Sequence, residues 1–326
     1  MDLIDKNIIF ELLVNCRVSY QTLAKKMKLS VNGIKKRIEK LTDTGIIRGY
    51  SIRPSLAMMD AEGVLALITT EDPTKSEIIQ DTIGNHPMIY AVSLLTDGSI
   101  ICYGFYRGSQ GLDELGTFLR QVPGVMKAEI HTIMAERGSK CELKQAHLKV
   151  IQCLREDARM RIGEIAHRSR LTPRRVRKTL KELTTEGGSK MIGYLPGKGP
   201  GDIRTMQACF YLRVDWDLNA GGYTAAIIRI DHDEGKEERS NLVEWLKTQY
   251  PFAFWYAYSS APSPTIFSVF VVEHIREVGK IVSETTHAPG VTSVKALLGY
   301  PTKSYPGLRE SYFDELKQKL DSKQRT

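Results

Sequence analysis

Apolar residues recur at helical spacing in two short stretches near the start of the chain. The first stretch contains Leu23, Ala24 and Met27, and the second contains Val31, Ile34, Ile38 and Leu41. Lys28 and Leu29 lie between them, and Ser30 can cap the second helix because its hydroxyl accepts a hydrogen bond from a backbone N–H. Gly45 follows the second stretch, as glycine often follows a helix end. The pattern predicts a helix-turn-helix, preceded by a helix over residues 5–14.

Polar residues occupy the side of the second helix that the apolar stripe leaves outward. Together with the capping serine, the candidate DNA-binding residues of this stretch are Ser30, Asn32, Lys35, Lys36 and Lys40. A helix that is buried along one side and carries amides and cations on the other fits a DNA major groove. A solvated basic face on an ordinary helical hairpin is the alternative, and this stretch alone leaves both open.

The same pattern returns 142 positions later without a gap. Identical pairs at this offset include Ile9 and Ile151, Leu12 and Leu154, Arg17 and Arg159, Ala24 and Ala166, Leu29 and Leu171, Lys36 and Lys178, Leu41 and Leu183, and Gly45 and Gly187. The candidate DNA-binding residues of the second copy are Thr172, Arg174, Arg175, Arg177, Lys178 and Lys181. Pro173 stands at the first helical position, where its missing N–H costs nothing. Core positions match while most outward positions differ, Lys36 and Lys178 being the identical pair, so the repeat favours one duplicated scaffold with two different DNA-reading surfaces.

Between the two copies the period of the pattern changes to that of β-strands. Strands are predicted at residues 64–70, 89–95, 100–106 and 125–135, and helices at 75–85 and 112–121. An Asp-Gly pair within residues 96–99 predicts a tight hairpin. The order βαββαβ is that of the ferredoxin-like unit, a four-stranded sheet with both helices on one face. The bare face needs a cover, and a second such sheet is the obvious partner.

A second βαββαβ unit is predicted after the second helix-turn-helix. Its strands are expected at 209–214, 252–258, 265–272 and 291–298, with an insertion at 215–238 and a last helix over 308–320. The fold class is therefore α+β, with two winged helix-turn-helix domains alternating with two ferredoxin-like domains. The predicted boundaries are 1–55, 60–138, 140–200, 204–300 and a C-terminal arm at 301–326. The wing strands are expected at 46–51 and 192–194, and the glycine-rich stretch 196–202 is expected to be a loop, since it lacks the GKS/T ending of a phosphate-binding loop.

Positive charge is concentrated in the two helix-turn-helix stretches. The 326 residues carry a net charge of +8. Residues 1–50 contain ten Lys and Arg against five Asp and Glu, and residues 140–198 contain fifteen against six, so the remaining segments are acidic. This asymmetry favours a nucleic-acid partner over a general attraction to membranes.

Cysteine and histidine patterns predict no metal or disulfide framework. The cysteines are Cys16, Cys102, Cys141, Cys153 and Cys209, an odd number without metal-knuckle spacing. His232 stands in an acidic stretch, where a solvated loop is favoured over a metal contact. We expect no cofactor and no catalytic residue. Since no apolar run reaches the length of a membrane span and no signal peptide is evident, we expect a cytoplasmic protein.

The order of elements and several short motifs resemble the Lrp/AsnC family of feast/famine transcription regulators, in two tandem copies. The motif residues are Asp5 with Ile8 and Ile9, Arg17-Val18-Ser19, Leu23-Ala24, Leu29-Ser30, the ending from Leu41 through Gly45 to Tyr50, and Pro123-Gly124-Val125. The resemblance implies DNA binding through the helix that begins at Ser30 and self-association through the sheets, within one chain or between two. It also implies an amino-acid effector near a Gly-Asp-x-Asp segment. Residues 96–99 and 260–264 lack that segment, so an effector is not supported.

The siroheme decarboxylases resemble these regulators and form the alternative hypothesis. That family holds its tetrapyrrole with a His-Asn-Tyr segment near the second strand. This chain has His86 and Tyr90 at the matching place without the complete motif, and His86 is expected to be a turn residue.

Overall fold

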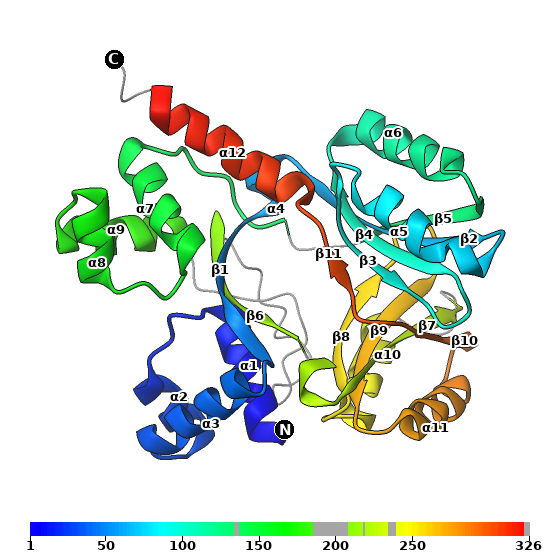
Figure 1. The fold of residues 1–326 in the computed structure, drawn as a ribbon. Helices are drawn as coiled ribbons and strands as arrows, with labels where there is room; N and C mark the ends of the chain where they lie inside the picture. The colour runs from blue at the N-terminus through cyan, green and yellow to red at the C-terminus, as the bar shows by residue number, and fades with distance from the viewer. Residues whose placement is uncertain (134–136, 185–207, 218, 234–238, 323–326) are drawn as a thin grey trace. The chain divides into compact units, whose positions relative to one another are not determined.

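The computed structural model describes residues 1–133, 137–184, 208–217, 219–233 and 239–322 (Figure 1). The predicted wing strand at 192–194 and the loop at 196–202 lie outside these residues. The chain forms two compact units, which are described separately below. Unit 1 comprises residues 1–58, 138–222 and 313–326, and unit 2 comprises residues 59–137 and 223–312. Within the described residues, no helix combines the length and apolar character that crossing a membrane requires.

Unit 1 contains two sets of three helices. The first set is α1 (Leu3–Val14), α2 (Tyr20–Met27) and α3 (Val31–Asp43), and the second is α7 (Gln145–Glu156), α8 (Ile162–Ser169) and α9 (Pro173–Thr184). Corresponding helices begin 142 positions apart, so the predicted repeat is confirmed. Gly45 follows α3 with a φ of 74°, a left-handed conformation that glycine adopts without strain.

The strand that follows the first helix set pairs with a strand from the second half of the chain. β1 (Ile47–Pro54) and β6 (Phe210–Trp216) form a two-stranded antiparallel sheet in unit 1, in which Tyr50 lies opposite Val214. We expected 46–51 to be a wing and 209–214 to open the second ferredoxin-like sheet. Both segments are strands, and β1 lies where the wing was expected. The assignment of 209–214 to the second ferredoxin-like sheet was wrong, because this strand pairs with β1 of the other copy. The short helix α4 (Leu56–Met59) follows β1.

Unit 2 contains two sheets with the same strand order. The elements of the first copy are β2 (Glu62–Thr70), α5 (Ser76–Gly84), β3 (Ile89–Leu94), β4 (Ile100–Tyr106), α6 (Gly108–Gln121) and β5 (Val125–Ile133). Those of the second are β7 (Thr224–His232), α10 (Arg239–Gln249), β8 (Phe254–Ser259), β9 (Thr265–Val272), α11 (Ile275–Thr286) and β10 (Val291–Leu298). The spatial orders β3-β4-β2-β5 and β8-β9-β7-β10 are equivalent and match the ferredoxin-like arrangement. The expected insertion at 215–238 was wrong, because it contains β7, the first strand of the second sheet.

Alternate residues of the central strands face two different hydrophobic layers. Val64, Ala66 and Ile68 of β2 pack with α5 and α6, whereas Leu65 joins a second cluster. That second cluster lies between the two sheets and contains Leu65, Leu95, Ile101, Ile133, Phe267 and Leu297. The bare faces of the two sheets therefore cover each other within one chain.

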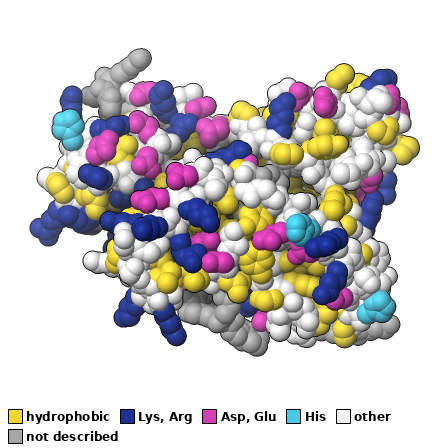
Figure 2. Space-filling view, turned by 60° about the horizontal axis from the view of Figure 1, so that its bottom comes forward, with side chains coloured by type: hydrophobic (Ala, Val, Ile, Leu, Met, Phe, Trp, Pro, Cys, Tyr) yellow, Lys and Arg dark blue, Asp and Glu magenta, His cyan; other side chains and the backbone are white. Residues whose placement is uncertain are grey.

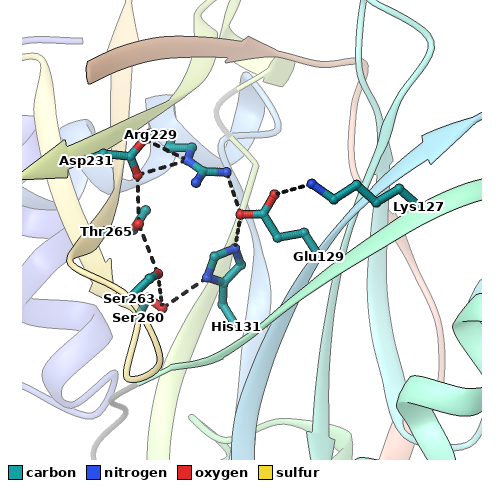
Figure 3. A network of polar contacts seen from close by, with 8 residues as sticks. All are labelled: Lys127, Glu129, His131, Arg229, Asp231, Ser260, Ser263 and Thr265. Carbon is teal, nitrogen blue, oxygen red and sulfur yellow. Dashed lines mark hydrogen bonds and ion pairs between the residues drawn. The ribbon is translucent and has the colours of Figure 1, made fainter. Parts of the chain in front are cut away.

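A chain of polar contacts also joins the two copies inside unit 2 (Figure 3). Glu129 on β5 accepts a hydrogen bond of 2.7 Å from Arg229 on β7, and His131 Nδ1 lies 3.0 Å from Ser260 Oγ. Backbone pairing continues the connection, since the N–H of Ala261 donates to the carbonyl of Thr132. The two copies of the sheet are thus joined by polar as well as apolar contacts within one chain.

The C-terminal arm contains the predicted helix, and a short strand precedes it. β11 (Lys303–Ser304) pairs with the edge strand β3, and α12 spans Gly307–Ser322. Tyr305 donates a hydrogen bond of 2.7 Å to Asp81 on α5. The segment that follows the second sheet therefore packs against the first sheet and its helix α5.

Candidate nucleic-acid interface

The turn between the last two helices has the same geometry in both copies. Lys28 and Arg170 occupy equivalent positions with φ values of 54° and 53°, a left-handed conformation that is uncommon outside glycine. The next residue donates its N–H across the turn in each copy, from Leu29 to Ala24 and from Leu171 to Ala166, both over 3.0 Å. The duplicated sequence therefore builds two matching helix-turn-helix frames.

The predicted capping residues begin both recognition helices. Ser30 Oγ accepts a hydrogen bond of 3.0 Å from the N–H of Gly33, and Thr172 Oγ1 accepts one of 3.2 Å from the N–H of Arg175. Both predictions are confirmed. Because these hydroxyls bond to their own helices, Ser30 and Thr172 would serve DNA binding mainly by fixing where α3 and α9 start.

The buried residues of α3 and α9 lie along one side of each helix and thereby determine which side faces solvent. Ile34, Ile38 and Leu41 are buried on α3, and their counterparts Val176, Leu180 and Leu183 are buried on α9. Val31 was expected in the same stripe, but 38 % of its surface is exposed, because it stands in the first turn beyond the packed helices. The opposite side of each helix faces outward.

The candidate DNA-binding residues lie on this outward side. Exposed members are Ser30, Asn32, Lys35, Lys36, Lys40, Thr172, Arg174, Arg177, Lys178 and Lys181. Arg175 is half-buried, and Lys178 lies 3.8 Å from Glu182 one turn along α9. Several Lys and Arg side chains project over the helical part of the molecule at the left of Figure 2. The contact of these residues with DNA stays a prediction.

Arg37, which lies beside Lys36 on α3, has an internal role that the sequence did not suggest. Its guanidinium donates hydrogen bonds of 2.7 Å to Asp5 and 2.8 Å to Asp2, both at the start of α1. Asp5 also forms a capping box with Asp2. The same cation clamps the recognition helix to α1, so it is withdrawn from the candidate reading surface.

Arg17 and Arg159, an identical pair of the repeat, connect the two helix sets. Arg17 donates to the carbonyls of Ala158 and Met160 at 2.8 and 2.9 Å. Arg159 lies over the rings of Tyr20 and Tyr50, with 5.1 and 4.9 Å to the ring centroids, and donates to the Tyr50 hydroxyl. The sequence could have indicated this role, because the repeat places an arginine at the same position in both copies. These contacts therefore hold the two helix-turn-helix sets together in unit 1.

In the polar network of unit 2, a serine contacts a histidine, and the histidine in turn contacts a glutamate. Ser260 Oγ lies 3.0 Å from His131 Nδ1, and His131 Nε2 lies 3.1 Å from Glu129. Ser260 is 0 % and His131 3 % exposed. Burial lowers the pKa of His131, which favours the neutral ring. Because a substrate would have no access to the serine hydroxyl, this arrangement serves to connect the two sheets.

The other histidines singled out in the sequence have structural surroundings. His86 lies in the turn after α5, as predicted, where its carbonyl accepts from Ile89 and its ring stacks near Phe118. His232 was expected in a solvated loop, but it is the last residue of β7 and is buried, because that stretch is a sheet strand. The described residues contain no cluster of three or more metal-ligating side chains.

A family model for winged helix-turn-helix DNA-binding domains matches this chain twice, at residues 1–48 and 143–187. The chain is also similar to the transcriptional regulator LrpC of Bacillus subtilis, with 25 % identity over 143 residues. That match covers 43 % of this chain and 96 % of LrpC. Both halves of the chain thus match a winged helix-turn-helix DNA-binding domain, and the chain resembles regulators of the Lrp/AsnC type. An uncharacterised HTH-type regulator of Pyrococcus furiosus is likewise 25 % identical over 135 residues, which cover 41 % of this chain and 91 % of that protein.

Solved structures of one protein match both copies of this chain over nearly its full length. The siroheme decarboxylase NirDL is matched over 98 % of this chain and 100 % of that chain, with a TM-score of 0.57 and 13 % identity. At this identity the likeness concerns the fold. It supports two alternating domain types in one chain as a stable architecture.

Proposed function

We propose that this protein is a sequence-specific regulator of transcription that binds double-stranded DNA in the cytoplasm through two non-identical recognition helices, α3 and α9. The observation that carries the proposal is the pair of matching helix-turn-helix frames, each with a buried apolar stripe and an outward row of cations. Proteins of this build place the second helix of the motif in the major groove. The names of the related regulators support the same function.

The outward residues of the two helices divide into two chemical kinds. α3 offers Lys35, Lys36 and Lys40, which suit phosphates as point charges. α9 offers Arg174 and Arg177 in addition to its lysines, and arginine binds guanine N7 and O6 through two parallel hydrogen bonds. We therefore propose that α9 makes the larger contribution to base reading and that the two half-sites differ in sequence.

Salt dependence of DNA binding tests the proposal. If about six phosphates are contacted, the affinity for a selected genomic fragment falls with salt at a log–log slope of roughly −5. The combined variant Lys35→Ala, Lys36→Ala and Lys40→Ala should bind more weakly and show a slope reduced by about three. Lys280→Ala is the matched control, because this exposed lysine lies on α11 of unit 2. A slope near zero, or equal affinity for the fragment and for competitor DNA, would contradict the proposal.

The full-length likeness to NirDL keeps a tetrapyrrole enzyme as the second candidate. We propose that this chain is not such an enzyme, because the residues at the matching place are otherwise engaged. Tyr90 stacks on Phe105 with 4.7 Å between ring centroids, and Arg309 lies over both rings. Titration with an iron tetrapyrrole, followed by absorbance, distinguishes the two functions. A shifted Soret band together with loss of a carboxyl group from the tetrapyrrole would favour the enzyme.

A further inference from the structure

Two segments of unit 1 that each carry a cysteine are fixed side by side by one serine. Ser55, which precedes α4, donates its N–H to the carbonyl of Cys209 over 2.8 Å and its hydroxyl to the carbonyl of Ser139 over 2.8 Å. The N–H of Ser139 in turn donates to the carbonyl of Ala208 over 3.0 Å. The backbone leading into α7 and the backbone leading into β6 are therefore held together at Ser139, two residues before Cys141, and at Ala208 and Cys209.

The space beside this clamp admits no larger residue than glycine at position 138. Gly138 has a φ of 66°, and a Cβ placed there would lie 2.5 Å from Ser55 Cβ and 2.8 Å from the Ala208 carbonyl. The N–H of Cys141 also donates to Met58 Sδ over 3.2 Å. Close packing thus fixes the approach of the two segments independently of the thiols.

The thiols of Cys141 and Cys209 are in hydrogen-bonding contact. The hydrogen bond from Cys209 lowers the pKa of the Cys141 thiol, and the same contact raises that of Cys209. Cys141 is half-exposed, whereas Cys209 is buried. The pair therefore combines a partly exposed cysteine whose thiol loses its proton more readily with a buried cysteine whose thiol keeps its proton.

The remaining cysteines have the opposite properties. Cys16, Cys102 and Cys153 are all buried. Burial raises the pKa of Cys16 and of Cys102 to about 12, and it also raises the pKa of Cys153. Within this chain, reactivity toward disulfides is thus concentrated at one position.

We propose that Cys141 and Cys209 form a reversible disulfide by exchange with a low-molecular-weight disulfide such as oxidised glutathione. The Cys141 thiolate attacks one sulfur of the reagent, which breaks its S–S bond, forms a mixed disulfide and releases one thiolate. Cys209 then loses its proton and attacks the Cys141 sulfur, so that the protein disulfide forms and the second glutathione leaves as a thiol. Two cysteines are oxidised and one disulfide is reduced, which balances the electrons.

The crosslink would enclose the whole second helix-turn-helix. Cys141 precedes α7, and Cys209 lies after α9 at the start of β6. A covalent loop around these helices restricts their unfolded ensemble, so oxidation should raise the thermal stability of this domain. The redox state of the surroundings would thereby act most directly on the helix-turn-helix that contains α9, which the crosslink encloses.

The test exposes the reduced full-length chain to oxidised glutathione, blocks free thiols with an alkylating reagent and maps the peptides without reduction. The expected result is a disulfide between the peptides of Cys141 and Cys209, with the other three cysteines alkylated. Cys209→Ser should accumulate the glutathione adduct at Cys141, about tenfold or more faster than any adduct at Cys153. Cys141→Ser should form neither product, and Cys153→Ser is the matched control that keeps the crosslink.

Two results would overturn the proposal. One is that, in the wild-type chain, Cys141 is recovered as the alkylated free thiol while another cysteine carries glutathione. The other is a stable mixed disulfide at Cys141 of the wild type that Cys209 never displaces. Since both are read from the unmodified chain, the outcome does not depend on the folding of any variant.

Discussion

At the scale of single residues, Lys36 and Arg37 are neighbours on α3 with opposite surroundings. Lys36 faces outward, whereas Arg37 is bound to Asp2 and Asp5. Helical spacing alone placed Lys36 correctly. It could not assign Arg37, because its partners lie more than thirty positions earlier and ion pairs of that kind depend on how α1 packs against α3.

Replacement of these two neighbours separates stability from DNA binding. Arg37→Ala leaves the carboxylate of Asp5, which is 7 % exposed, without its partner, and should lower the free energy of unfolding of unit 1 by about 1–3 kcal/mol. Lys36→Ala should change it by less than about 0.5 kcal/mol while weakening DNA binding. Urea titration and a binding assay on both variants measure the two effects. Equal stability of the two variants would mean that the clamp is not a stabilising contact.

Arg174 and Lys178 distinguish base reading from phosphate contact on α9. Arg174→Ala should relax the preference for one base pair by about 1–3 kcal/mol, since it removes a candidate guanine contact. Lys178→Ala should weaken binding to all sequences by a similar factor. Selection of bound sequences with each variant gives the comparison. If the two variants yield the same base preferences, the division of roles between them is incorrect.

At the scale of elements, the hydrophobic pattern located most strands but could not choose their partners. Residues 265–272 and 291–298 were predicted with the bounds that β9 and β10 have. β6 was also located, but its pairing with β1 depends on a contact between copies that no local pattern encodes. β7 was missed because the spacing between repeats suggested an insertion. Local periodicity therefore predicted the element types, and long-range pairing decided their assembly.

The network that joins β5 to the second copy predicts a dependence of stability on pH. Burial lowers the pKa of His131 below 6.5, and Glu129, Arg229 and Asp231 face the same ring. The unfolded chain binds a proton at His131 near pH 6.5, whereas the folded chain binds it only at a lower pH, so this contribution to stability is complete above about pH 6.5 and is lost as the pH falls from there through the folded-state pKa. Unit 2 should therefore lose stability as the pH falls below about 6.5.

His131→Gln tests this assignment by urea unfolding at several pH values. The free energy of unfolding of the variant should depend less steeply on pH. Part of the dependence should remain, because burial also lowers the pKa of His86. His167→Gln is the matched control, because this side chain is exposed on α8 in unit 1. An unchanged slope in His131→Gln would show that the ring titrates equally in the folded and unfolded chains.

At the scale of the whole molecule, one chain contains two copies of the helix-turn-helix and two copies of the sheet. The two sheets cover each other through Leu65, Ile101 and Phe267, and β1 pairs with β6. The sequence predicted that two such sheets cover each other, within one chain or between two, since each has one uncovered apolar face, but it did not predict the pairing of β1 with β6. The two copies differ on their outward surfaces, so the internal symmetry is only approximate. On this basis we propose that the chain acts as a pseudo-dimer with two unlike DNA-reading helices.

A footprint on a selected DNA site, combined with the mass of the bound protein from light scattering, tests this central claim most directly. We expect one chain to protect two half-sites of different sequence, spaced by about one helical turn or a multiple of it. Arg174→Ala should weaken protection of one half-site and leave the other unchanged. A palindromic footprint bound by two chains, with both half-sites weakened equally by Arg174→Ala, would contradict the pseudo-dimer as the reading unit.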